Sequence, residues 1–191
     1  MLGTVVVMNK HLSDRQVIEP RLGIDIGRVI ISGSSHPSGS DTAFFDGNEA
    51  AMLATPEMAG AVEAIGRLVE LFDGRVWLVS KCGRRVQERT LRWLDGHDFY
   101  ARTGLDRGHV RFCLARADKR GHCIDLGLTH FVDDRKDVHE AILGTVSHQY
   151  LFGPQRGPAP SYVTSVSSWR VLERLITTSL VSPVTAPAAP A

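Results

Sequence analysis

Short apolar runs recur along the chain, and segments with helical spacing of apolar positions follow them. The runs span residues 22–27, 75–80, 110–113, 129–133 and 148–152. The run at 75–80 is apolar on both faces and rich in β-branched residues, which is typical of a strand inside a parallel sheet. Strands that alternate with helices predict right-handed βαβ units. We therefore predict an α/β fold, a three-layer Rossmann-like domain with a central five-stranded parallel sheet.

The segments between the runs predict the helices. Residues 55–57 (Thr-Pro-Glu) combine a capping hydroxyl, a proline suited to the first helical position and an acid, so we expect a helix to begin there. Its buried face should consist of apolar residues at helical spacing, namely Met58, Val62, Ile65, Val69 and Phe72. Further helices are expected over about 84–94 and 119–126, and around Val138 and Trp169.

Both ends of the chain and one internal segment differ in composition from the rest. Residues 1–20 are mixed and end at Pro20, and we interpret them as an N-terminal leader. Residues 181–191 are rich in Pro and Ala, which predicts a disordered tail. Residues 32–54 begin with Ser, Gly and Pro and predict a loop or small flap. The domain proper then spans 21–180, with room for at most a small cap insertion.

Composition excludes some classes of function. The chain has 22 Lys and Arg against 21 Asp and Glu, a formal net charge of +1, which gives no electrostatic reason to expect nucleic acid or a membrane surface as a partner. The N-terminal apolar run is too short for a signal peptide or a membrane span. The three cysteines form no C-x-x-C pair, so neither a disulfide framework nor a zinc site is expected. We expect a cytoplasmic protein.

Polar residues follow three of the predicted strands. Asp25 lies in the first run, Ser80 ends the second, and Asp133 and Asp134 end the fourth. Because ligands of parallel α/β sheets bind at the carboxyl ends of the strands, these side chains predict a site there. Each also has a plain structural interpretation: Asp25 as a buried acid, Ser80 as a turn residue and the acid pair as a helix cap.

Four segments together resemble the motifs of the haloacid dehalogenase-like (HAD) superfamily. Asp25, in the segment Gly-Ile-Asp-Ile-Gly-Arg-Val, resembles the nucleophilic aspartate of the first motif. Ser80 resembles the hydroxyl of the second motif and Lys119 the lysine of the third. Phe-Val-Asp-Asp, ending in Asp133 and Asp134, resembles the metal-binding fourth. The resemblance covers about residues 21–153, and no motif is specific by itself.

The resemblance implies a magnesium-dependent hydrolase, most simply a phosphatase that acts on a phosphorylated small molecule. Asp25 would form an aspartyl phosphate, which divides one difficult displacement into two easier ones. Mg²⁺ would be held by Asp25, the Gly27 carbonyl and Asp134, with Asp133 as a further ligand. Such oxygen ligands suit this cation. Ser80, Lys119 and Arg28 would bind the phosphoryl group.

One position departs from the superfamily pattern. Phosphatases of this type carry a second Asp two residues after the nucleophile, where this chain has Gly27. That Asp is a general acid and base, a role typically worth ~10²–10⁴-fold in rate. Its absence favours an activated substrate, and keeps open a binding or regulatory module or a hydrolase of a non-phosphate bond. His36 or Asp41 could stand in for the missing acid.

Other expectations concern residues near the motifs. Lys81, Arg116 and Arg120 compete with Lys119 for the third-motif role. Asp137 follows Asp134 at a slightly closer spacing than is common in the superfamily. Cys82 lies near Ser80, but no histidine adjacent in sequence would activate it as a nucleophile. The short insertion predicts an open site, compatible with a bulky substrate or with a cap from a second subunit, so an oligomer is possible.

Overall fold

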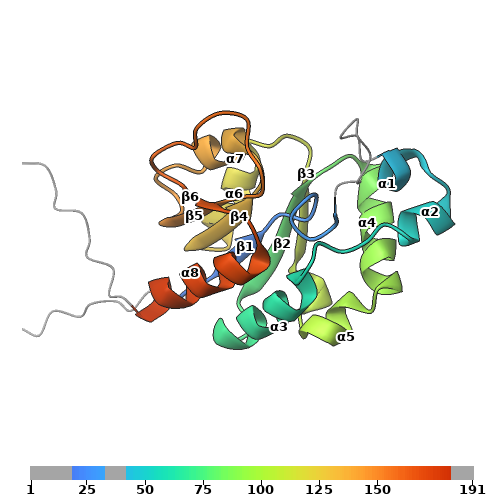
Figure 1. The fold of residues 1–191 in the computed structure, drawn as a ribbon, viewed down its shortest axis with the longest axis horizontal. Helices are drawn as coiled ribbons and strands as arrows, with labels where there is room; N and C mark the ends of the chain where they lie inside the picture. The colour runs from blue at the N-terminus through green and yellow to red at the C-terminus, as the bar shows by residue number, and fades with distance from the viewer. Residues whose placement is uncertain (1–18, 33–41, 182–191) are drawn as a thin grey trace, which may run out of the picture.

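The computed structural model describes residues 19–32 and 42–181, and these form a six-stranded sheet in which every pairing is parallel (Figure 1). The strand order is β3-β2-β1-β4-β5-β6. The strands are β1 (Leu22–Ile24), β2 (Val76–Lys81), β3 (Val110–Cys113), β4 (His130–Asp133), β5 (His148–Phe152) and β6 (Thr164–Val166). The predicted parallel sheet is confirmed, with β1 at its centre.

The prediction of five strands is wrong by one, because β6 adds an edge strand beside β5. β6 has three residues, two of them exposed, so it lacks the apolar run that marks a buried strand. The first strand is also shorter than the predicted 22–27. Ile26 accepts hydrogen bonds at its carbonyl from the amides of Ile30 and Ile31, and this turn ends the strand early.

Helices cover both faces of the sheet, as a three-layer fold requires. The helices are α1 (Thr42–Asp46), α2 (Glu49–Leu53), α3 (Ala61–Leu71), α4 (Arg84–Gly96), α5 (Phe99–Thr103), α6 (Lys119–Asp125), α7 (Lys136–Ala141) and α8 (Trp169–Val181), with a short 3₁₀ turn at Arg107–His109. One core unites α3, α4, α5 and α8 with one face of the sheet. A smaller core unites α6 and α7 with the other face. Among the described residues no helix is long and apolar enough to cross a membrane.

A glycine in β1 lets the smaller core close over the sheet. A Cβ on Gly23 would lie 2.5 Å from the Phe131 ring and 2.6 Å from Leu128, closer than real Cβ contacts allow. Only glycine therefore lets the Phe131 ring pack this closely against the central strand. The same ring has the Lys119 ammonium 5.7 Å from its centre, so this packing also supports the site described below.

The prediction that a helix begins at Thr55 is wrong, and α3 begins at Ala61. The Thr55 hydroxyl donates backward to the carbonyl of Ala51 within α2. Residues 56–58 pair with the chain after β1, because the Ser32 amide donates to Pro56 and the Met58 amide to Ile30. Tertiary pairing thus overrides a local capping signal. The predicted buried positions Val62, Ile65, Val69 and Phe72 are confirmed.

Residues 32–54 were predicted to form a loop or small flap, and the described part of the segment is helical. α1 and α2 occupy it, and the Asn48 side chain caps α2 by accepting from the Ala51 amide. Residues 33–41, which include His36 and Asp41, lie outside the described residues, as do 1–18 of the predicted leader and 182–191 of the predicted tail. α5 was not predicted, since it has only five residues.

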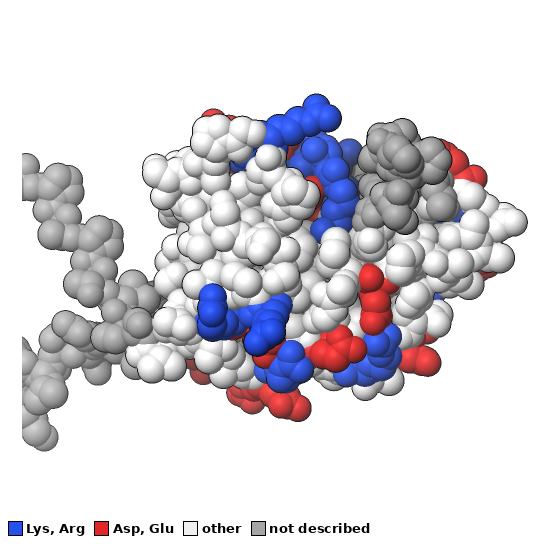
Figure 2. Space-filling view, in the orientation of Figure 1, with Lys and Arg blue, Asp and Glu red and all other residues white. Residues whose placement is uncertain are grey.

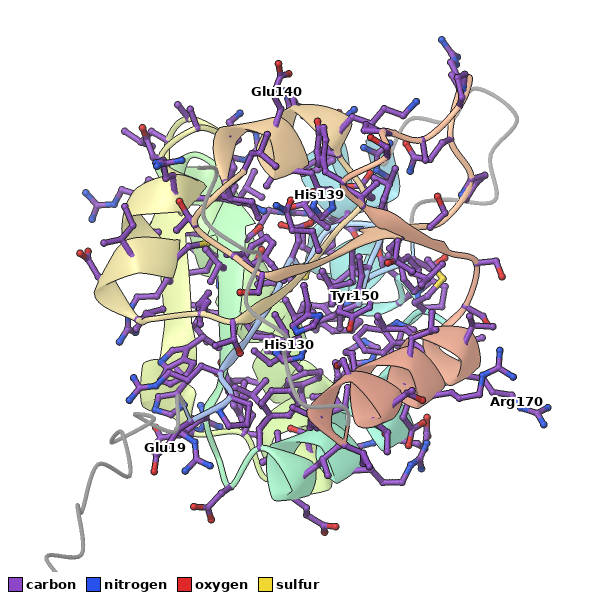
Figure 3. The ribbon with its side chains drawn as sticks, turned by 90° about the vertical axis from the view of Figure 1, so that its left-hand side faces the viewer. Glu19, His130, His139, Glu140, Tyr150 and Arg170 are labelled. Carbon is purple, nitrogen blue, oxygen red and sulfur yellow. The ribbon has the colours of Figure 1, made fainter. Side chains whose placement is uncertain are left out.

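A histidine in β4 is buried between the sheet and α8. His130 in β4 is 2% exposed and lies between the sheet and α8, near Tyr150 (Figure 3). Its two ring nitrogens contact the Thr129 and Ser179 hydroxyls at 2.7 and 3.0 Å. Burial, reinforced by His148 stacked on the ring, lowers the pKa of His130 to about 3.

We predict that stability falls as the pH drops below about 6.5. The unfolded chain then takes up a proton that folded His130 refuses, so the free energy of unfolding decreases until the pH reaches the folded-state pKa of about 3. At pH 4.5 the loss from this group amounts to ~2–3 kcal/mol, at 1.36 kcal/mol per pKa unit. Urea unfolding of the wild type and of His130→Asn across this range measures it. The variant should show the shallower slope, and equal slopes would contradict the prediction.

Candidate functional site

A cavity of about 540 Å³ opens at the carboxyl ends of β1, β2 and β4. Seven residues predicted from the sequence line it together: Asp25, Gly27, Arg28, Ser80, Lys119, Asp133 and Asp134. Five Lys or Arg side chains and three carboxylates are among the lining residues, so the cavity favours an anionic ligand. Figure 2 shows Lys and Arg atoms gathered toward the top of the view, between the places of α7 and α1 in Figure 1, with acidic atoms beside them.

Asp25 is placed by the central strand and the turn after it. Its amide donates to the Val132 carbonyl of β4 at 2.9 Å, so the backbone continues the sheet ladder by one residue before turning. The turn itself needs a left-handed residue, and Arg28 supplies it with φ 60°. Its amide donates to the Ile31 carbonyl at 2.8 Å, which fixes the turn. This geometry leaves Gly27 exposed at the cavity wall.

Lys119 joins two strand ends through its ammonium group. Its Nζ lies 2.6 Å from Asp25 Oδ1 and 2.7 Å from Asp133 Oδ2, and the side chain is 2% exposed. Burial by itself lowers the pKa of an ammonium, but the charges of Asp25 and Asp133 more than offset burial and raise the pKa of Lys119. Lys119 is therefore a fixed cation that neutralises part of the acidic cluster.

Asp133 is held on every side. Its Oδ1 accepts from the Arg135 amide at 2.9 Å while its Oδ2 contacts Lys119. Its backbone carbonyl lies 3.2 Å from Nε2 of buried His139, which points into the protein beneath α7 whereas Glu140 points outward (Figure 3). Burial raises the pKa of Asp133, and Lys119 opposes that rise. Both of its carboxylate oxygens therefore have hydrogen-bond donors beside them, and one of these donors is Lys119.

Asp134 faces the cavity and pairs with a cation from the turn after β1. Arg28 Nη2 lies 2.7 Å from Asp134 Oδ2, and Arg135 Nε lies 4.0 Å from the same oxygen. The backbone carbonyl of Asp134 accepts from the Gln155 amide group at 3.1 Å, so the loop after β5 helps to hold the residue. Burial and the nearby charge of Asp25 raise the pKa of Asp134, and Arg28 opposes the rise.

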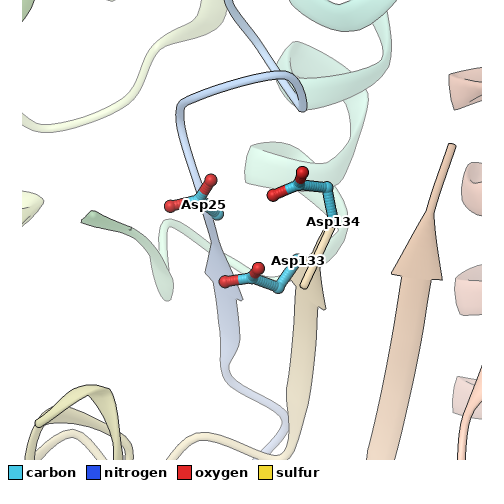
Figure 4. Close-up of side chains that lie close together, drawn as sticks. All are labelled: Asp25, Asp133 and Asp134. Atoms are coloured by element: carbon cyan, nitrogen blue, oxygen red, sulfur yellow. The ribbon is translucent and has the colours of Figure 1, made fainter. Parts of the chain in front are cut away.

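The three aspartates are spaced to hold a metal ion. One carboxylate oxygen from each lies within 4.8 Å of the others (Figure 4). Oxygens bound to one Mg²⁺ at ~2.1 Å lie up to ~4.2 Å apart, so small side-chain rotations suffice. Asp25 and Asp134 fit best as ligands, because Asp133 has both oxygens engaged. The exposed backbone of Gly27 borders the same space.

One wall of the cavity is apolar and comes from the insertion after β1 and from α4. Phe44 and Phe45 of α1 line it together with Val86 of α4. Arg89 fixes α1 to α4, since its guanidinium donates to the carbonyls of Phe44 and Gly47, both at 2.7 Å. For residues 32–54 we predicted a loop or small flap and not this wall. The paired aromatic residues after a Ser- and Gly-rich stretch were the signal that was available.

The remaining candidates fall into different places. Arg120 donates to the carbonyls of Ala141 and Leu143, away from the cavity, whereas Lys81 and Arg116 line its rim. Asp137 pairs with Arg116 at 3.3 Å and is outside the three-aspartate cluster.

Cys82 lines the cavity but stays a protonated thiol. Burial raises its pKa to about 11, and the charge of Asp25 adds to the rise. The thiolate is the nucleophilic form of cysteine, so the structure gives Cys82 no activation at neutral pH. Cys82, Cys113 and Cys123 are all buried and free, in accord with the expected absence of a disulfide framework among the described residues.

Comparison of the chain with protein-family models and with curated proteins gives no match.

Proposed function

We propose that the chain is a Mg²⁺-dependent HAD-like hydrolase that cleaves a phosphorylated small molecule through an aspartyl phosphate on Asp25. The observation that carries the proposal is the placement of Asp25: its carboxylate lies in a cation-lined cavity, 2.6 Å from Lys119 and within metal-sharing distance of Asp134. A carboxylate so buried and so paired is a costly arrangement for a purely structural residue.

In this proposal a carboxylate oxygen of Asp25 attacks phosphorus, and the bond from phosphorus to the leaving oxygen breaks. Lys119 holds Asp25 in place and offsets the negative charge that the approaching phosphoryl group brings. The Ser80 hydroxyl donates to a phosphoryl oxygen. Water then attacks phosphorus, which releases phosphate and restores the carboxylate. Mg²⁺, when bound by Asp25, Asp134 and the Gly27 carbonyl, would neutralise charge on the phosphoryl oxygens.

The leaving group determines which esters such a site could cleave. With Gly27 in place of an acid, no carboxyl group at this position protonates the departing oxygen. The leaving groups of aryl and acyl phosphates depart without that proton, whereas the alkoxide leaving group of an alkyl phosphate needs it. The apolar wall of Phe44, Phe45 and Val86 offers a surface for the carbon part of the substrate. Activated phosphate esters with an apolar portion are therefore the proposed substrate class.

Phosphate release from a panel of aryl phosphates, acyl phosphates, nucleotides and alkyl phosphates, with and without Mg²⁺, tests the proposal. Wild-type chain should act on the first two groups in Mg²⁺, and Asp25→Asn should be inactive. Asp125→Asn is the matched control, because Asp125 is an exposed carboxylate at the end of α6. Activity that survives in Asp25→Asn would show that the aspartyl route is wrong.

Mg²⁺ is also predicted to stabilise the fold. A ligand at ten times its Kd stabilises the native state by ~1.4 kcal/mol, which raises Tm by roughly 3–5 °C in a domain of this size. Asp134→Asn should abolish the shift, and Asp137→Asn, an exposed acid three residues later, should retain it. Differential scanning fluorimetry with and without Mg²⁺ measures the effect. An equal shift in Asp134→Asn would place the bound cation elsewhere.

A second candidate function is a binding module that captures a phosphorylated molecule without cleaving it. Two observations favour it: Gly27 replaces the acid, and Arg28 pairs with Asp134, one of the two carboxylates that fit best as metal ligands. The same panel separates the two functions. A binding module would take up Mg²⁺ and phosphate esters, yet release no phosphate from any of them.

A further inference from the structure

Arg28 pairs with one oxygen of the carboxylate that a divalent cation would need. Its Nη2 lies 2.7 Å from Asp134 Oδ2, whereas Lys119 contacts only Asp25 and Asp133. Each carboxylate of the cluster therefore has a cation beside it: Lys119 lies beside Asp25 and Asp133, and Arg28 lies beside Asp134, with Arg135 farther away at 4.0 Å. Asp134 is 14% exposed at its side chain, so its charge is partly desolvated and the ion pair with Arg28 is a substantial partner for it.

The backbone of Arg28 is fixed, whereas its side chain has space to change conformation. The backbone is fixed, because the amide donates to the Ile31 carbonyl and φ is 60°, within the left-handed region. The side chain is 38% exposed and lines the cavity, so the guanidinium has space to leave Asp134 without any change in the turn. A strained residue next to a candidate nucleophile is also a common feature of functional sites.

A cation at Asp134 and the guanidinium of Arg28 exclude each other on the same oxygen. Once displaced, the guanidinium remains inside a cavity that would hold a phosphoryl group against Asp25. Arginine presents two parallel N–H donors that match phosphate oxygens, and it keeps its charge at any physiological pH. The same side chain can therefore bind first Asp134 and then the phosphoryl group of the substrate.

We propose that Arg28 is a competing cation that covers Asp134 until Mg²⁺ takes that carboxylate, and that it then turns to the phosphoryl group of the substrate. The inference rests on the proposed function, because it assigns Mg²⁺ and a phosphate to this cavity. It makes a distinctive prediction: removal of Arg28 strengthens binding of the cation and weakens binding of the anion. A residue that merely stabilises the turn would shift neither affinity in this opposed way.

Isothermal titration calorimetry tests the proposal without any need for turnover. Mg²⁺ is titrated into the wild type, Arg28→Asn and Arg135→Asn, and inorganic phosphate is then titrated into each in saturating Mg²⁺. Asn tolerates the left-handed backbone of position 28. Arg135→Asn is the matched control, because it removes the same charge from beside the same oxygen, at 4.0 Å instead of 2.7 Å.

We expect Arg28→Asn to bind Mg²⁺ at least about tenfold more tightly than the wild type, since a charge-assisted contact no longer has to be broken. Phosphate should bind about tenfold more weakly to this variant. Arg135→Asn should change Mg²⁺ affinity less than about fivefold, as for an exposed ion pair. Arg28→Lys, which keeps the charge without the paired donors, should lie between the wild type and Arg28→Asn, and it serves as the second variant should Arg28→Asn fold poorly by circular dichroism.

Unchanged Mg²⁺ affinity in Arg28→Asn, an increase equal to that of Arg135→Asn, or tighter phosphate binding would overturn the proposal. So would a lack of Mg²⁺ binding in both the wild type and Arg28→Asn. A chain that shows the opposed shifts but hydrolyses no phosphate ester would refute the hydrolase and leave the role of Arg28 intact. The failure of one proposal is thus distinguishable from the failure of the other.

Discussion

The Gly27→Asp variant is expected to hydrolyse alkyl phosphates about 10²-fold faster than the wild-type chain, and aryl or acyl phosphates only a few-fold faster. The new carboxyl group would supply the proton that an alkoxide leaving group requires, an effect typically worth ~10²–10⁴-fold. Aryl and acyl phosphates have good leaving groups that depart without a proton, so their rate of hydrolysis should increase little. The difference between the two substrate classes, more than the gain on either one, is the result that matters.

The structure permits this substitution. Gly27 is not among the residues with positive φ, and the left-handed position of the turn belongs to Arg28 instead. A Cβ built on Gly27 meets only Asp25 Oδ2, at an ordinary 3.9 Å. The residue is exposed at the cavity wall, so the longer side chain has space. Nothing in the backbone geometry or the packing requires glycine here.

Kinetics of the variant and the wild type on matched alkyl and aryl phosphates, with thermal melts of both, provide the measurement. Gly27→Asn is the control, since it has the size and polarity of Asp without a proton to donate near neutral pH. Equal gains in Gly27→Asn and Gly27→Asp would mean that the side chain acts by binding. A folded Gly27→Asp chain with no gain on any ester would count against the missing-acid explanation and favour the binding module.

The strands of the sheet could be predicted from the sequence where burial on both faces requires a run of apolar residues. The strand at 75–80 is apolar on both faces because helices cover both, and such a run has few alternatives to a central parallel strand. β6 has no apolar run, since only Val166 among its three residues is buried. Thr55 shows the opposite failure. The Thr-Pro-Glu segment has the residues of a helix start, but the Thr55 hydroxyl donates to the preceding helix α2.

The candidate site also has a part that could be predicted from the sequence and a part that could not. Asp25, Ser80 and Asp133 converge because parallel strands place their carboxyl ends at one edge, a rule that needs no distance information. The partner of Asp134 could not be predicted, because Arg28 lies 106 positions earlier and many arginines were equally eligible. Asp133 and Asp134 were both predicted as metal ligands, and that prediction stands for the pair, but the contacts of Asp133 with Lys119 and the Arg135 amide could not be read from the sequence.

Lys119→Met is expected to destabilise the fold by ~3–5 kcal/mol, the usual cost of removing one partner from a buried ion pair. Lys119 is among the largest fully buried side chains of the described residues, and its ammonium is shared by two carboxylates. Methionine fills nearly the same volume, so the loss reports charge more than packing. Urea unfolding followed by tryptophan fluorescence measures the change.

A second substitution separates the electrostatic cause from any residual packing defect. In Lys119→Met/Asp133→Asn the buried cation and one buried carboxylate are removed together, and Asp133 is 1% exposed. The double variant should recover ~1–3 kcal/mol relative to Lys119→Met, because an uncompensated buried charge costs more than a neutral amide. Mg²⁺ should stabilise Lys119→Met more than it stabilises the wild type, since it replaces positive charge that the variant lacks. A Lys119→Met chain as stable as the wild type would show that Asp25 and Asp133 do not depend on this ammonium, and would remove the argument that Lys119 holds Asp25 ready for attack.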